Sequence, residues 1–206
     1  EFKGTYALNS LHRFQSAFTK HYREQINNTF NLNLTMDLRS LGVRQLPEDL
    51  FTFNYTGVLA SSVFVEARYS NRHQTFIGAG SKSKDLIDGT LLLDRSRGNA
   101  RYWADTFCGV CENEKRDNDD IFVKGSYFLS TSGTGSHSMT FGYDNFNDKR
   151  FANNHQSGSD YRILGTSAFF AGAGESTVIY PQFLGDGSTI IQWNPIPQGS
   201  QGSNFR

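Results

Sequence analysis

The most regular pattern in the chain is a strict alternation of apolar and polar residues in the segment TFNLNLTMDL, from Thr29 to Leu38. Every second residue is apolar, beginning with Phe30, and every residue between them is polar. Because successive side chains of a β-strand point to opposite faces, this segment is predicted to form a strand with one apolar and one polar face.

Similar, less regular alternation recurs along the chain. The predicted strands lie near residues 11–19, 29–38, 51–59, 63–70, 121–129 and 137–146. Residues 60–62 and the Ser/Thr/Gly-rich stretch 130–136 predict the turns of two hairpins, and the polar stretch 20–28 is expected to join the first two strands. We therefore predict an all-β, antiparallel fold with six strands, each of about the length that a tilted barrel strand needs.

The predicted connections alternate in length. Segments 20–28, 60–62 and 130–136 are short and 39–50 is intermediate, whereas 71–119 and 147–206 are long and polar. Outer-membrane barrels have short periplasmic turns and long extracellular loops, so the pattern predicts a transmembrane β-barrel segment whose two long loops lie outside the cell. Soluble β-sandwiches show the same alternation within strands, but loops of roughly 50 residues are uncommon in compact soluble domains.

The barrel hypothesis assigns each alternating residue to lipid or to the lumen. The expected lipid-facing residues are Phe30, Leu32, Leu34, Met36, Leu38, Val63, Val65, Val123, Tyr127, Phe141 and Tyr143. The expected lumen-facing polar residues are Asn31, Asn33, Asp37, Glu66, Arg68, Lys124 and Asp144. A basic residue on the lipid face would cost about 2–4 kcal/mol near the bilayer midplane, which favours this assignment of the charges.

Composition agrees with β-structure and names no partner. The chain has 18 Phe, 9 Tyr and 20 Gly, and its 20 Lys and Arg balance its 20 Asp and Glu, so no basic excess points to nucleic acid. No apolar run approaches the roughly 18 residues of a membrane helix. The chain starts at Glu1 and ends on a Gly/Ser/Gln-rich run, which we interpret as part of a longer protein.

Cys108 and Cys111 form the only CxxC motif and lie in the predicted loop 71–119. A zinc site needs four ligands and the sequence has no second pair, and a thioredoxin-type motif needs a helix start that the pattern does not predict. The favoured interpretation is a structural disulfide that closes a loop in an oxidising compartment.

Other candidate motifs carry little chemistry. Gly78–Ser83 (GAGSKS) resembles a phosphate-binding loop but has Ser81 where the motif requires Gly before the Lys. The acidic run Asp117–Asp120 leaves calcium open as an alternative, although it lacks the spaced ligands of a helical calcium loop. The five histidines are scattered, so we predict no catalytic centre, no metal and no cofactor.

Two parts of the chain, Pro47–Ser70 (PEDLFTFNYTGVLASSVFVEARYS) and Asp105–Ile163 (including DTFCGVCENEKRDNDD and NHQSGSDYRI), resemble the barrel region of Oar-like TonB-dependent receptors, and IIQWNPI at Ile190–Ile196 fits the same pattern. The resemblance covers about two thirds of the chain. It implies a barrel of about 22 strands whose lumen is filled by a plug domain.

Such receptors use proton-motive force, relayed by TonB through the plug, to take up or export a large or scarce ligand. The resemblance therefore implies outer-membrane lipid, TonB and an unidentified ligand at the outer loops as partners, and no nucleic acid. The plug domain is absent from this chain, and six strands do not close such a barrel. A secreted β-rich binding or adhesion module, a scaffold subunit of an envelope complex and, more distantly, a glycan-active enzyme remain as alternatives.

Overall fold

The computed structural model describes residues 1–29, 34–170, 176–195 and 197–205. The described chain forms two β-sheets, and its only helical turns are the 3-10 segments Leu38–Ser40 and Arg95–Arg97. All strand pairings are antiparallel except one, in the smaller sheet, and two isolated bridges, Met36–Arg101 and Ser81–Cys108, are also parallel. The prediction of an all-β, antiparallel fold is confirmed, and neither sheet closes into a barrel.

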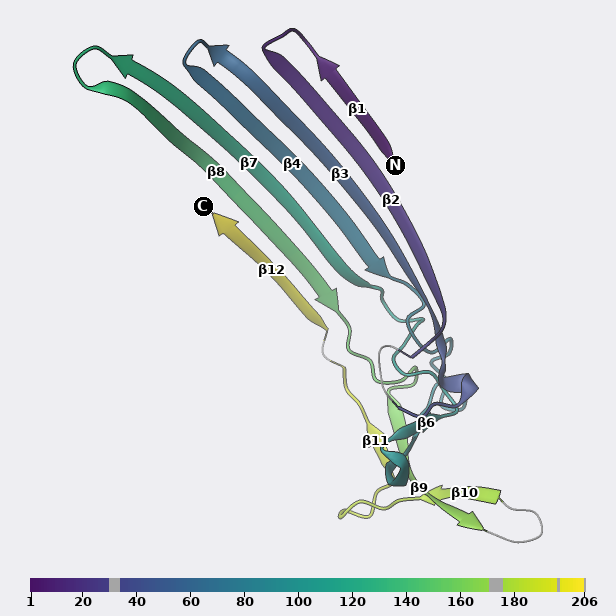
Figure 1. Cartoon of the computed structure of the whole chain (residues 1–206). Helices are drawn as coiled ribbons and strands as arrows, with labels where there is room; N and C mark the ends of the chain where they lie inside the picture. The colour runs from purple at the N-terminus through teal and green to yellow at the C-terminus, as the bar shows by residue number, and fades with distance from the viewer. Residues whose placement is uncertain (30–33, 171–175, 196, 206) are drawn as a thin grey trace.

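The larger sheet has seven long strands that lie side by side and bend together (Figure 1). We call it the main sheet, and its order follows the chain. Its strands are β1 (Phe2–Ala7), β2 (His12–Asn28), β3 (Gly42–Ala60), β4 (Val63–Phe76), β7 (Glu114–Thr131), β8 (Gly135–Ala152) and β12 (Gln198–Phe205).

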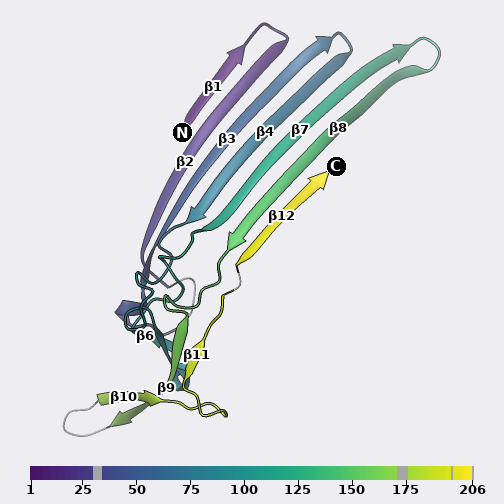
Figure 2. The ribbon, with the colours of Figure 1, turned by 180° about the vertical axis from the view of Figure 1, so that it is seen from behind.

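The connections sort by length between the two ends of the main sheet. The short ones, residues 8–11, 61–62 and 132–134, all lie at one end, which we call the short-turn end. The long ones, residues 29–41, 77–113 and 153–197, all lie at the other, which we call the long-connection end. Seen from behind, the same division is evident (Figure 2). The asymmetry of the connections is therefore a property of the whole sheet.

The described parts of the long connections fold together into a small second unit, which we call the cap (residues 34–41, 77–113, 153–170, 176–195 and 197). Its sheet comprises β5 (Leu91–Asp94), β6 (Ala100–Tyr102), β9 (Tyr161–Phe170), β10 (Ser176–Pro181) and β11 (Ile190–Gln192). β5 and β9 are parallel and join the two long connections to each other. The two long loops predicted from the sequence thus pair with each other.

The hydrophobic core lies in the cap. Leu91, Leu93 and Leu164 form its centre, and Leu184 and Ile191 pack against them. The main sheet contributes few buried apolar side chains, such as Leu46 and Ala152 near the cap. Apolar burial therefore holds the cap together, whereas the main sheet is held mainly by its backbone hydrogen bonds and cross-strand contacts.

The predicted strand at 29–38 is wrong for residues 34–38, and residues 30–33 lie outside the described part of the chain. The backbone around Met36 pairs with Arg101 of the cap, and the Asp37 carboxylate accepts hydrogen bonds from Arg39 at the start of the 3-10 turn. Leu38 is 78% exposed. This segment crosses from β2 to β3, which pair directly with each other, and its described backbone pairing is with the cap.

Other boundaries also differ from the prediction. Residues 20–28 belong to β2, which pairs with β3 and not with a strand at 29–38, and most of 39–50 belongs to β3. The long loops are shorter than predicted because β4, β7 and β8 extend into them. The main sheet contains two strands that were not predicted: β1, which precedes the first predicted strand, and β12, which lies in the predicted loop 147–206.

Leu164→Ala is expected to lower the stability of the cap by about 2–5 kcal/mol, because it leaves a cavity beside Leu91. Hydrogen exchange of the β5 and β9 amides measures this change. Leu86→Ala is the matched control: Leu86 is 66% exposed, so the same truncation should change exchange by less than about 0.5 kcal/mol. Equal effects of the two variants would contradict a cap core centred on Leu164.

Candidate functional site

The main sheet has two unlike faces, and cross-strand pairing shows which residues share each one. Val63, Val65, Val123, Tyr127, Phe141 and Tyr143 lie on the same face, which we call the apolar face. Glu66, Arg68, Lys124 and Asp144 lie on the opposite face, which we call the polar face. The described residues Leu34, Met36, Asp37 and Leu38 belong to neither face, because they lie outside the main sheet.

No described element of the chain covers the apolar face. Phe141 is 65% exposed, and Phe53, Ile121, Val123 and Tyr143 are all more than a third exposed. On β7 the apolar side chains run from Ile121 to Leu129, close to the roughly 9–11 residues that a tilted transmembrane strand needs. Monomeric soluble proteins rarely leave so continuous an apolar surface in contact with water.

The apolar band ends at a sharp boundary toward the long-connection end. Three successive cross-strand rows, each read from β2 through β3, β4 and β7 to β8, show it. They are Phe14-Tyr55-Ala67-Val123-Tyr143, then Ser16-Phe53-Tyr69-Ile121-Asn145, then Phe18-Phe51-Asn71-Asp119-Asn147. The first row is free of strongly polar residues, the second becomes polar at β8, and the third becomes polar already at β4.

The boundary thus moves by two residues between β3 and β4 and by two more between β7 and β8, always toward the short-turn end. This is about one residue per strand. With a rise of about 3.3 Å per residue and a strand spacing of about 4.8 Å, the offset corresponds to strands inclined by about 35° to the normal of the band. Barrel strands are inclined by 35–45° to the barrel axis.

Beyond the boundary, the apolar face carries pairs of basic and acidic side chains. Lys149 lies 3.1 Å from Asp119, His73 lies 3.6 Å from Asp117, and Lys20 lies 3.9 Å from Asp49. Asp120, the next residue of the acidic run, points to the other face and lies 3.7 Å from Arg68. The run therefore spreads over both faces of a strand, and its carboxylates do not converge on one calcium ion.

Charges on the polar face are largely paired across neighbouring strands. Lys124 lies 3.8 Å from Glu66, and Arg72 lies 2.5 Å from Glu48. The Arg68 guanidinium also lies over the Phe122 ring, 5.1 Å from its centroid. Such partly exposed pairs add little stability each, but they keep a charged wall close to neutral.

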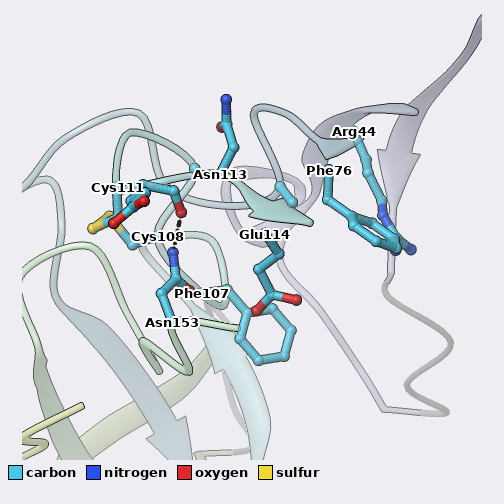
Figure 3. Close-up of a pocket in the computed structure, with 11 residues that line it drawn as sticks. Arg44, Phe76, Phe107, Cys108, Cys111, Asn113, Glu114 and Asn153 are labelled. Atoms are coloured by element: carbon cyan, nitrogen blue, oxygen red, sulfur yellow. Dashed lines mark hydrogen bonds between the residues drawn. A yellow bond between two sulfur atoms is a disulfide. The ribbon is translucent and has the colours of Figure 1, made fainter. Parts of the chain in front are cut away.

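A pocket of about 330 Å³ lies where the polar face meets the cap (Figure 3). Arg44, Phe76 and Glu114, from the cap-proximal ends of β3, β4 and β7, form one side, and all three belong to the polar face. The other side comes from the loop 107–113 and Asn153, whose amide donates to the Glu112 carbonyl oxygen. The pocket is therefore joined to both units of the fold.

The loop wall of the pocket is rigidly built. Cys108 and Cys111 form a disulfide, as the sequence favoured. The Ser81 amide donates to the Phe107 carbonyl (3.1 Å), and the Gly109 amide donates to the Ser81 carbonyl (2.9 Å). Phe107 has a φ of 67°, a left-handed conformation that a bulky residue rarely adopts and that the surrounding contacts must hold.

Close backbone approach explains a glycine behind this wall. Gly80 has a φ of 142°, and a Cβ there would lie 2.6 Å from the carbonyl carbon and oxygen of Phe107. Any other residue would push the two loop segments apart. The sequence GAGSKS at 78–83 therefore has a packing role at this contact, next to the pocket wall.

Arg44 places a partly buried positive charge in the wall of the pocket. Its guanidinium lies 4.5 Å from the centroid of the Phe76 ring, and the Arg116 guanidinium lies 5.3 Å from the same ring. Burial lowers the pKa of Arg44, the nearby Arg23 and Arg116 lower it further, and Glu114 acts in the opposite sense. Its buried Nε has no hydrogen-bond partner within the described part of the chain.

Sequence reasoning did not single out this pocket. Arg44 and Phe76 are far in the chain from Phe107 and Glu114, and the four residues share no motif. The one available signal was the CxxC pair, which marks the loop wall but not the strands that face it. Within the described residues, no group of three or more His, Cys, Asp or Glu side chains lies close enough to hold a metal ion.

The chain matches no protein-family model, no curated protein and no solved structure. Among the described residues, no helix is long and apolar enough to cross a membrane.

Asp105→Asn is expected to stabilise the cap at neutral pH. Asp105 is 7% exposed and its Oδ1 has no hydrogen-bond partner among the described residues, so burial raises its pKa, with Lys82 acting in the opposite sense. Because the folded state then holds the proton more tightly than the unfolded state, stability falls as pH rises from the ordinary value of 3.8 through the raised value.

The gain from Asp105→Asn should therefore shrink as the pH falls below the ordinary value, which thermal unfolding at neutral pH and at about pH 3.5 measures. Asp88→Asn, at an exposed carboxylate of the same connection, is the control and should differ little between the two conditions. A destabilising effect of Asp105→Asn at neutral pH would contradict the prediction.

Proposed function

We propose that this chain is part of the wall and outer end of a transmembrane β-barrel in the bacterial outer membrane. The observation that carries the proposal is the apolar face of the main sheet, whose sharp boundary shifts by about one residue per strand. In a soluble sandwich a second layer covers such a face, and here no described element does so. Lipid is a medium in which this face needs no cover.

The other faces and ends of the sheet take their roles from this placement. The polar face, with the Lys124–Glu66 and Arg68–Asp120 pairs, borders the lumen. The short-turn end lies in the periplasm and the cap lies outside the cell, because outer-membrane barrels place their long connections there. The open edges at β1 and β12 are continued by further strands, since an unpaired strand edge is costly in lipid.

Within this class we propose a TonB-dependent receptor that takes up or exports a large or scarce ligand. The proposal rests on the resemblance of Pro47–Ser70 and Asp105–Ile163 to Oar-like receptors. A cap at the outer end, with a pocket on the lumenal face, suits ligand capture in such a protein. No catalytic constellation argues for an enzyme among the described residues, and the proposed role is transport.

Nitroxide labels at Val123 and Lys124, each through a cysteine variant in liposomes, test the wall proposal. The Val123 label should collide mainly with oxygen, which concentrates in the bilayer, and the adjacent Lys124 label mainly with a water-soluble nickel complex, because neighbouring residues face opposite sides. A label at Asp119 is the matched control, since it shares the face of Val123 but lies beyond the apolar boundary.

The Asp119 label should report water. If the Val123 label is as accessible to nickel as the Asp119 label, the apolar face does not lie in lipid. A secreted binding module, or a scaffold subunit whose partner protein covers this face, would then replace the barrel.

The receptor class predicts that the full-length protein fractionates with the outer membrane and can be cross-linked to TonB in cells. The measurement is recovery of TonB with the purified, cross-linked protein. A porin from the same membrane is the control and should yield none. Outer-membrane localisation without TonB recovery would keep the barrel and reject the energised receptor.

A further inference from the structure

The pocket between Arg44 and Phe107 is lined by a guanidinium, that of Arg44, which donates no hydrogen bond to a described residue. Arg116 is already paired within the protein: its guanidinium donates to Glu114 (3.1 Å) and to the carbonyl oxygens of Phe151 (2.8 Å) and Lys115 (2.7 Å). Arg44 stacks on Phe76, and its buried Nε has no partner in the described part of the chain. The Nη atoms of Arg44 are not among the buried atoms and form no hydrogen bond with a described residue, so they are the donors that an acceptor in the pocket can reach.

The charges around this donor favour an anion. The positive charges of Arg23 and Arg116 lie close enough to Arg44 to repel its charge, and Glu114 is a nearby acid whose negative charge attracts it. Glu114 is itself occupied by Arg116. A guanidinium with two free Nη groups binds a planar carboxylate through two parallel hydrogen bonds, which gives direction as well as attraction.

The acids at the pocket limit the charge of the ligand. Glu112 lines the exposed rim, and Glu114 lines the inner wall. A group with two negative charges would meet both carboxylates while gaining one free arginine. A singly charged carboxylate gains the same hydrogen bonds with less repulsion.

Phe107 gives the pocket an apolar surface opposite the arginine side (Figure 3). Its strained backbone and the disulfide next to it hold the ring in place before any ligand binds, which reduces the ordering cost of binding. A volume of about 330 Å³ is at the lower end of ligand pockets and suits a body of about one ring.

We propose that this pocket binds a small organic monocarboxylate, with its carboxylate on the Arg44 guanidinium and its apolar body against Phe107. The pocket opens on the same face as the Lys124–Glu66 pair, so in the proposed barrel it lies at the outer end of the lumen. The binding itself requires only the fold described above and does not depend on the apolar face lying in lipid.

The test uses the whole chain in detergent and 4-fluorophenylacetate as the probe, followed by fluorine NMR. The uncharged 4-fluorophenylacetamide has nearly the same shape, and 4-fluorobenzylphosphonate offers the same ring with a more highly charged head. 4-Fluorophenylacetate should bind at least about tenfold more tightly than either of these two compounds, since a tenfold ratio of dissociation constants needs only about 1.4 kcal/mol.

Variants assign the contacts. Arg44→Gln should weaken binding of 4-fluorophenylacetate to the affinity of 4-fluorophenylacetamide. Arg44→Lys should retain only part of the affinity for 4-fluorophenylacetate, because Lys keeps the charge but lacks the planar guanidinium. Phe107→Gly should weaken all three probes without straining the chain, since glycine tolerates the positive φ. Arg13→Gln, at an exposed arginine on the polar face of β2 far along the sheet, should leave binding unchanged.

Equal binding of acetate and amide, or no binding of the acetate by a chain whose circular dichroism shows an intact fold, would overturn the carboxylate site. Tighter binding of the phosphonate would overturn the monoanion assignment. Full acetate binding by a folded Arg44→Gln variant would remove the arginine from the site. None of these results changes the Val123 label measurement, so failure of the pocket and failure of the membrane wall are distinguishable.

Discussion

The exposed apolar face of the main sheet is the constraint on which the rest of the structure depends. Burying apolar surface contributes about 25 cal/mol per Å², and here the chain leaves a band of large side chains on β2, β3, β4, β7 and β8 uncovered. Its own core is confined to the cap around Leu91 and Leu164. A single-layer sheet of this kind needs a surrounding medium or partner that is itself apolar, and a bilayer meets that need over the whole band.

The main sheet and the cap are stabilised in different ways. The main sheet keeps a regular ladder of backbone hydrogen bonds over strands as long as β3, Gly42–Ala60, which is what a wall in a water-free medium requires. The cap has a conventional buried core and a disulfide, which is what a structure in an oxidising aqueous space can use. The pocket lies where the two meet, so its arginine side is fixed by the sheet and its loop side by the cap.

In the proposed receptor, long loops at the outer end would be a poor binding surface if each were mobile. Here β5 from one long connection pairs with β9 from the next, and the backbone around Met36 from the first pairs with Arg101. The three connections therefore stabilise one another, and Phe107 can be held in a conformation that an isolated loop would not keep. Strain at Phe107 is supported by the folded cap, which is the usual arrangement where a side chain must be presented in one orientation.

The sequence by itself determined the properties that depend on neighbouring residues along one strand. Alternation in 63–70, 121–129 and 137–146 was enough to predict strands there, and it also sorts Val123 from Lys124, because side-chain direction alternates along any strand whatever it pairs with. The Ser/Thr/Gly stretch at 130–136 likewise indicated a hairpin turn.

Tertiary structure decided which strands have partners. Residues 34–38 continue the most regular alternation in the chain but form no strand, because β2 continues through 20–28 and pairs with β3 directly. Gln198–Phe205 is rich in Gly, Ser and Gln and shows no such pattern, yet it is a strand because β8 offers it a free edge. The pocket depends on the same level of organisation: Arg44, Phe76 and Glu114 become neighbours only through the register of β3, β4 and β7, since sequence patterns record what alternates along a strand but not what lies across it.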